Sequence, residues 1–487
     1  MYNAYVTTLK NVRPHPNADR MKLADCFGNT VCVGLDAAEG EIVIYFPTDG
    51  QLSMEYAETN NLVRKKDEAG NNVGGYLDPD KRNIKAIRLR GEKSDGLTMP
   101  LSSLAYTGVN LDELNVGDVI NIVNGHEICN KYIPRSNPRK SAAAGNKTRK
   151  HKAPIAPLFA EHADTEQLAY NLNAFKPGDE IEITLKMHGT SGRTAHMPVL
   201  KKYKRTLWDF LTGKPGTPIY EDGYVSGTRR VVLENYEGGF YGNNSFREQH
   251  SKIFEGKLMK GETVYYEIVG FTDTGAPIMG DCNNNKLNDK DFLKQYGATT
   301  TFSYGCKPEA STLWVPDGEG DMNLVGRIKQ SDMYIYRMTM TNEDGFVVEY
   351  TPDFMRYRCE QMGVKTVPVF AKGHIGMDGC VSWINVITGE DMITSEGRET
   401  RENDPYSFDY NPGDSMKAVA EKFYDGPDPI GKTHVREGVV VRIINRPKFS
   451  AYKHKNFSFK VLEGIIKETA AAPDMEEAQE VESNGDN

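Results

Sequence analysis

A lysine at the end of an alternating apolar segment is the first residue whose type and place could do chemistry. Ile183–Leu185 leads into Lys186, and Gly189 follows three positions later. Gly189 allows unusual backbone angles or the close approach of a phosphate. A lysine amine attacks an electrophile only when it is neutral, so a catalytic lysine needs burial or nearby cations. The spacing alone is weak evidence, because a surface lysine that ends a strand would give the same sequence.

Two acidic residues lie in or beside apolar, strand-like segments further along the chain. Glu267 is inside one such segment, and Glu437 begins another. An unpaired buried charge is expensive, so acids in such places usually have cationic partners, although solvent-facing acids at strand ends are the plain alternative. The basic and aromatic segment Lys453–Val461 follows, with Lys455 and Lys460. Two acids flanked by lysine-bearing segments indicate a site for nucleotide phosphates and a metal ion.

The order of these segments resembles that of the covalent nucleotidyltransferases, which include ATP-dependent DNA ligases, RNA ligases and mRNA capping enzymes. The matching segments are Lys186–Gly189 (motif I), Glu267–Gly270 (motif III), Glu437–Arg442 (motif IV) and Ser458–Val461 (motif V). The beginning of the chain is similar to the N-terminal OB-like domain of nick-sealing RNA ligases, including those of large phages. The segments that carry this second likeness are Asn11–Arg20, Val43–Asp49 and Ile87–Leu97. The resemblance covers residues 1 to about 468, with gaps.

The resemblance implies a role for each candidate residue. Lys186 would attack the α-phosphorus of ATP and form lysyl-AMP, and Glu437 would act at the metal-bound reaction centre. Lys460 would bind the α-phosphate, with Lys455 as a second basic contact. The residues expected around the nucleotide are Leu185, His188, Gly189, Arg229, Glu267, Tyr334 and Tyr336.

The resemblance implies that different residues of this set contact different parts of the substrates. Glu267 would bind the ribose, and Tyr334 or Tyr336 would support the adenine ring. Arg229 would contact the ribose or the strand that ends in a 3′-OH. His188 stands where many relatives carry Asp or Glu, so its contact with the nucleotide is a departure from the pattern. Phosphoryl transfer depends on positioning and charge stabilisation, which lysines and Mg²⁺ or Mn²⁺ would provide.

The function implied is an ATP-dependent RNA ligase that seals 3′-OH and 5′-phosphate ends, at nicks or ends in duplex RNA. A DNA ligase or a capping enzyme is the nearby alternative, but those enzymes usually carry the OB domain after the catalytic domain. A non-catalytic protein that binds structured RNA is the alternative from another class. It is suggested by His15–Arg20, which resembles tRNA-binding OB modules. That alternative leaves the ordered lysines and acids unexplained.

The elements that must position these residues form a multidomain chain. Short strands separated by Gly and Asn over residues 1–130 predict an OB-like β-barrel. Residues 131–157 are expected to be a basic linker, and 470–487 an acidic disordered tail. Residues 158–469 mix strands and helices without βαβ alternation, which favours an α+β nucleotidyltransferase domain (ATP-grasp-like ligase) with antiparallel sheets. Insertions are expected at 275–330 and 371–430.

Composition leaves these expectations open while excluding a membrane protein. The formal net charge is −9 over 487 residues, but eight Lys or Arg and no acid lie between Lys131 and Lys152. No apolar stretch approaches about 18 residues, and no signal peptide is recognisable. Seven unpatterned cysteines indicate a reducing compartment. We therefore expect a cytoplasmic monomer, in the host cytoplasm if the chain is phage-encoded. The segment Lys201–Trp208 is either a solvated helix face or a contact for nucleic-acid phosphates.

Overall fold

The computed structural model describes residues 2–66, 70, 72–133, 153–212, 216–236, 245–316, 322–392 and 412–468. Most of the predicted basic linker and all of the predicted acidic tail lie outside these residues. The chain divides into two compact units. The first is Met1–Pro134 with Cys282–Thr299 and Phe457–Thr469, and the second is Arg135–Asp281 with Thr300–Asn456 and Ala470–Asn487. Two segments of the range 158–469 thus group with the N-terminal residues.

The first unit contains small antiparallel sheets. β5 (Ile42–Phe46) lies between β1 (Tyr5–Thr8) and β11 (Leu97–Pro100), and β2 (Lys10–Pro14), β3 (Lys22–Cys26) and β4 (Asn29–Val33) form a meander. The two-stranded pairs are β6 (Gly50–Leu52) with β14 (Cys129–Lys131), β7 (Arg64–Lys66) with β8 (Asn72–Gly74), β9 (Ala86–Leu89) with β10 (Glu92–Asp95), and β12 (Ile122–Val123) with β13 (His126–Glu127). Its α-helices are α1 (Met54–Thr59), α5 (Lys290–Tyr296) and α9 (Phe457–Glu468).

The predicted OB-like barrel is not confirmed, because the described strands of this unit pair as separate open sheets. Gly96 shows one physical reason. It separates β10 from β11 with φ +127°, and a Cβ there would lie 2.7 Å from the Phe46 carbonyl oxygen. This sharp bend, which glycine permits, sends the two successive strands into different sheets. A core that includes Val6, Ile44 and Tyr56 nevertheless packs the unit together.

The second unit is built on two seven-stranded sheets. The first sheet has the order β15 (Glu166–Gln167), β32 (Ser450–Lys455), β31 (Gly438–Ile443), β16 (Glu180–Lys186), β28 (Val369–Ile375), β29 (Val381–Asn385) and β30 (Asp391–Met392). The second has the order β19 (Val232–Leu233), β18 (Thr217–Gly227), β17 (Thr190–Lys204), β20 (Glu262–Gly270), β25 (Ser331–Thr341) and β26 (Val347–Glu349), with β27 (Lys365–Thr366) also paired to β25. Most pairings are antiparallel, which confirms that part of the predicted fold class.

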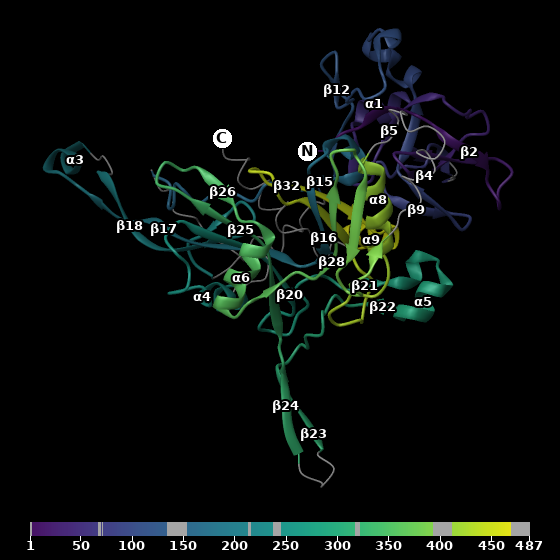
Figure 1. The fold of residues 1–487 in the computed structure, drawn as a ribbon. Coiled ribbons are helices and arrows are strands. Elements are labelled where there is room, and N and C mark those ends of the chain that lie inside the picture. Colours follow the sequence, from purple (N-terminus) through teal and green to yellow (C-terminus); the bar gives the residue numbers. More distant parts are fainter. Residues whose placement is uncertain are drawn as a thin grey trace. The chain divides into compact units, whose positions relative to one another are not determined.

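Alternation along β20 explains how the second sheet is covered. Val264, Tyr266 and Ile268 are buried in a core with residues of α4 (Ser245–Lys252) and α6 (Pro352–Met362). Tyr265 and Glu267 therefore point to the opposite face, because successive strand residues alternate. Figure 1 shows α4 and α6 beside this sheet. The other elements of the chain are α3 (Leu207–Thr212), β21 (Cys282–Asn283), β22 (Thr299–Thr300), β23 (Ser311–Pro316), β24 (Met322–Ile328) and α8 (Pro412–Phe423).

Among the described residues, no helix combines the length and the apolar character that crossing a membrane requires.

Candidate functional site

Lys186 is the last residue of β16 and lies on a mixed, accessible face of the first sheet. Ile181, Ile183 and Leu185 alternate with it and are almost fully buried on the opposite face. The predicted nucleotide contact Leu185 thus turns its side chain away from Lys186. Antiparallel pairing sets Lys186 opposite Gly438 on β31, and this register brings the preceding residue, Glu437, close. The Lys186 Nζ lies 2.7 Å from the Glu437 Oε1.

Glu437 is a buried acid with lysine and histidine nitrogens around it. The Lys455 Nζ lies 3.4 Å from its Oε1, and the His188 Nδ1 lies 3.7 Å from its Oε2. Burial raises the pKa of Glu437, but Lys186, then Lys455 and His188, outweigh burial and lower it to about 2. The group is therefore a carboxylate at neutral pH. Its Oε2 is buried and accepts no hydrogen bond from the described residues.

Gly189 brings the turn after Lys186 against β20. A Cβ at this position would lie 2.4 Å from the Ile268 carbonyl oxygen and 2.9 Å from the Glu267 Cγ. Any side chain here would force the turn away from β20, so glycine keeps Glu267 next to the motif I turn. The His188 backbone N–H donates to the Tyr304 Oη at 2.7 Å, and its ring packs edge-on against Phe302.

The two candidate adenine supports differ in environment. Tyr334 pairs with Glu267 across β20 and β25 and is buried, and its hydroxyl donates to the Asp332 Oδ2 at 3.3 Å. Tyr336 is half-buried at a β-bulge, where its ring contacts His162 edge-on at 5.2 Å. Tyr336 therefore has more ring surface open to a ligand than Tyr334 has.

Arg229 lies in the turn after β18 and forms an ion pair with Asp164. Arg230 binds the other oxygen of the same carboxylate at 3.1 Å. Burial raises the pKa of Asp164, but the two arginines bring it below its ordinary value. Arg193 holds the turn in place, because its buried guanidinium donates to the carbonyl oxygens of Thr228 and Arg230.

Lys460 and Lys455 fall in different units. Lys460 is in α9 of the first unit, where its Nζ donates to the Asp95 Oδ2. Lys455 ends β32 in the second unit, the unit that also contains Lys186 and Glu437. Of the two motif V candidates, Lys455 is thus the lysine that shares a sheet with Lys186.

Several residues near this site were not predicted, because no spacing in the sequence marks them. Arg247 of α4 is buried, and its guanidinium donates to the Ser191 carbonyl oxygen at 2.7 Å and to the Thr190 side chain. Tyr304 supports the backbone of His188, as described above. Both come from segments far from Lys186 in the chain, so only the fold brings them to the motif I turn.

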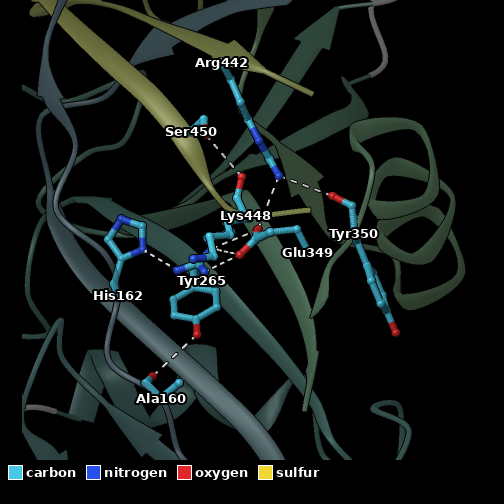
Figure 2. Close-up of polar contacts among 9 residues, drawn as sticks. Ala160, His162, Tyr265, Glu349, Tyr350, Arg442, Lys448 and Ser450 are labelled. Carbon is cyan, nitrogen blue, oxygen red and sulfur yellow. Dashed lines mark hydrogen bonds and ion pairs between the residues drawn. The ribbon is translucent and has the colours of Figure 1, made fainter. Parts of the chain in front are cut away.

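A buried polar network links the two sheets. Arg337 of β25 donates its Nε to the Glu349 Oε1 at 3.0 Å, and the Arg442 Nη2 of β31 lies 3.4 Å from the Glu349 Oε2. Figure 2 shows Arg442 directed at both Glu349 and the backbone oxygen of Tyr350, with His162 and Tyr265 nearby. The His162 Nδ1 accepts from Arg337 at 3.1 Å, and burial with Arg337 holds the pKa of His162 well below its ordinary value.

No protein-family model and no curated protein matches the sequence. Solved structures of an RNA ligase from Naegleria gruberi do match. Two lysine-to-alanine variants of that ligase, each with ATP and Mn, are 15% and 16% identical to this chain, with TM-scores of 0.50 and 0.51. Each match covers 94% of this chain and 97% or 98% of the other. The same ligase with pyrophosphate is 15% identical, with a TM-score of 0.50, and covers 94% and 97%. This chain therefore has the fold of that RNA ligase.

Proposed function

We propose that the protein is an ATP-dependent RNA ligase that becomes adenylylated on Lys186. The observation that carries the proposal is the group Lys186, Glu437 and Lys455, a lysine and a second cation on one buried carboxylate. The fold, shared with a known RNA ligase over nearly the whole of both chains, supports it. That ligase has been studied with ATP, AMP and pyrophosphate, which are the substrate and products of such a reaction.

The proposed reaction has three steps, the first two at the α-phosphorus of ATP and the third at the phosphorus of the RNA 5′-phosphate. The Lys186 Nζ loses its extra proton to solvent, the neutral amine attacks the α-phosphorus of ATP, a P–N bond forms as the P–O bond to pyrophosphate breaks, and the remaining excess proton on nitrogen is also released to solvent. An oxygen of an RNA 5′-phosphate then displaces the lysine and takes the AMP. Finally the 3′-OH attacks the activated 5′-phosphate, which forms the phosphodiester and releases AMP. Lysines around the transferred group stabilise the negative charge that develops in each step.

Glu437 is suited to hold cations rather than to accept a proton. A base with a pKa of about 2 is far too weak to deprotonate an ammonium group near neutral pH. The Glu437 Oε2, buried and without a hydrogen bond from the described residues, is a fitting ligand for a hard divalent ion. Mg²⁺ commonly binds to one carboxylate together with substrate phosphates. We assign Mg²⁺ or Mn²⁺ to Glu437, where the ion would neutralise charge on the phosphates of ATP.

The nucleotide is proposed to lie between the two sheets, beside the motif I turn. Glu267 would accept hydrogen bonds from the ribose hydroxyl groups, and Tyr336, being more open than Tyr334, would support adenine. His188 and Lys455 would lie near the α-phosphate. Arg229 would contact the ribose or the 3′-OH strand once the Asp164 ion pair rearranges.

RNA ends in a duplex, above all nicks, are the proposed substrate. Support comes from the N-terminal segment of the first unit, Met1–Pro134, which precedes the catalytic residues as the OB-like accessory domain of nick-sealing RNA ligases does. We accordingly retain an OB-like role for this unit in binding RNA, although its strands form open sheets. A DNA ligase is the nearby alternative, and the sugar on each side of the nick distinguishes the two.

Incubation with α-³²P-ATP and Mg²⁺ tests the adenylylation. Label should stay with the wild-type protein through denaturation and be absent from Lys186→Ala. Lys176→Ala is a matched control, because Lys176 is an exposed lysine shortly before β16. Failure of the wild type to take up label, or uptake by Lys186→Ala, would overturn the proposal.

Substrate identity needs a second measurement on the same proteins. Nicked duplexes with RNA or DNA on the 3′-OH side, the 5′-phosphate side and the template should be sealed fastest when the 3′-OH strand is RNA. Equal or faster sealing of all-DNA nicks would replace RNA ligase by DNA ligase as the function.

A further inference from the structure

A long β-hairpin extends beyond the second sheet. Within β17 only Thr190–Ala195 pair with β20, whereas pairing with β18 continues to Lys204 opposite Thr217. The outer parts of β17 and β18 thus form a two-stranded ribbon, in which each strand pairs with the other and not with the rest of the second sheet. Figure 1 shows α3 at the outer end of this ribbon.

The helix at this outer end exposes large apolar side chains. Leu207, Trp208 and Leu211 are 84%, 74% and 75% exposed. An exposed tryptophan in a group of apolar side chains often marks a binding surface. The Thr206 N–H and hydroxyl both donate to the Asp209 carboxylate, at 2.8 and 2.7 Å, which fixes the start of the helix. The aromatic ring is therefore carried on a locally ordered turn.

Positive charge is concentrated in the same outer ribbon. Lys201, Lys202, Lys204 and Arg205 lie on or just after the end of β17, and the facing segment 217–220 contains no charged residue. The nearest acids of β18 are Glu221 and Asp222, further from α3. They pair with Lys201 at 3.5 Å and with Lys260 at 3.3 Å. Lys202 and Lys204 share one face of the ribbon, because strand residues two apart point the same way.

This arrangement excludes one of the two alternatives for Lys201–Trp208, the solvated helix face. Lys201, Lys202 and Lys204 are not one face of a solvated helix, because they belong to β17, and Arg205 follows directly after that strand. A strand that presents basic side chains beside an exposed aromatic ring matches the way in which proteins bind nucleic-acid strands. Lysines neutralise phosphates, and a base stacks on the ring whatever its identity. The chain as a whole carries a net charge of −9, so this local basic surface is a contrast with the rest.

We infer that the outer hairpin, residues 201–211, is an RNA-binding surface. Lys202, Lys204 and Arg205 contact backbone phosphates, and Trp208 stacks on an unpaired base. The inference rests on the proposed function, since it assigns part of the substrate of an RNA ligase to a surface outside the group around Glu437.

Fluorescence anisotropy with a labelled RNA, offered both single-stranded and as a nicked duplex, tests this surface. Lys202→Glu with Lys204→Glu should weaken RNA binding about tenfold or more, and should lower the slope of log affinity against log salt by about two. Trp208→Ala should weaken binding of the single strand about tenfold, and Trp208→Phe should largely restore it. The matched control is Lys252→Glu with Lys422→Glu, which makes the same change in net charge at two exposed helical lysines.

Two outcomes would overturn the inference. One is RNA affinity and salt slope that match those of the wild type in both the lysine variant and Trp208→Ala. The other is an equal loss in the charge-matched control, which would assign the effect to net charge. Label uptake from α-³²P-ATP, measured in parallel, separates this result from the proposed function. Loss of RNA binding with full uptake supports the surface, whereas absence of uptake in the wild type refutes the ligase and leaves the binding result standing by itself.

Discussion

Replacing Glu437 by glutamine would remove a negative charge from between two lysines and His188 while keeping the size of the side chain. In the folded protein these groups lower the pKa of Glu437 from 4.5 to about 2, against the effect of burial. That difference corresponds to about 3 kcal/mol in favour of the folded carboxylate at neutral pH. We therefore expect Glu437→Gln to lower the free energy of unfolding by about 3 kcal/mol at pH 7.

The pH dependence distinguishes ionisation from packing. Because the folded-state pKa lies below the unfolded value, the contribution is complete above the unfolded pKa and is lost as pH falls towards the folded one. At about pH 3.5 the difference between wild type and variant should shrink to about 2 kcal/mol. Burial of a neutral amide in the same space would instead give a difference that does not change with pH.

Urea unfolding of wild type and Glu437→Gln, at pH 7 and at about pH 3.5, measures both quantities. Glu390→Gln is the control, because Glu390 is exposed and its removal should change the unfolding free energy by less than about 0.5 kcal/mol. A Glu437→Gln variant as stable as wild type at pH 7, or a difference constant with pH, would refute the electrostatic reasoning.

Other variants test the parts of the site separately. Lys455→Ala should slow lysyl-AMP formation by about 100-fold or more, because it removes a cation beside Glu437, and a larger effect of Lys460→Ala in the same labelling assay would contradict the assignment. Tyr336→Ala should raise the KM for ATP about tenfold while Tyr336→Phe does not, and a stronger KM effect of Tyr334→Ala would reverse the order of the two tyrosines. Arg247→Ala should lower kcat for adenylylation with little change in KM for ATP, because Arg247 donates to the Ser191 carbonyl oxygen and the Thr190 side chain just after the motif I turn. Partial rescue by Arg247→Lys is expected, and a loss confined to KM would refute the positioning role.

The sequence predicted Lys186 and Glu437 as members of one site, each at the end of a strand, but it did not predict the ion pair between them. Each residue adjoins a run of alternating or β-branched apolar residues, which predicts two strands, observed as β16 and β31. The motif order implied that these strands serve one site. Their antiparallel register, with Lys186 opposite Gly438, could not be read from either run alone, since register depends on pairing partners distant in the chain.

The sequence could not decide between Lys455 and Lys460 as the motif V lysine, because it does not show where the strand ends and the helix begins. Lys453–Val461 looks uniformly basic and aromatic, but β32 ends at Lys455 and α9 begins at Phe457. The change from strand to helix shows only after Lys455, where Phe459 and Leu462 are buried three positions apart, as on one face of a helix. Lys460 then follows α9 into the first unit, where Asp95, 365 positions earlier, binds it. No local sequence pattern predicts that Lys460 binds an aspartate 365 positions away.

The Arg337–Glu349–Arg442 network does not contact Glu437, but it affects the position of Glu437 through β31. Arg442 is on β31, the strand that begins directly after Glu437, and it contacts both Glu349 and the Tyr350 carbonyl oxygen of the other sheet. Buried ion networks add little net stability, because desolvation offsets their attraction. Their directional hydrogen bonds do restrict how two packed elements can slide. Since Arg337 and Arg442 share one carboxylate, a shift of β31 along its own axis would break the contact of Glu349 with Arg442 while leaving that with Arg337. The network therefore favours one position of β31 against the second sheet, and with it one position of Glu437 relative to Glu267.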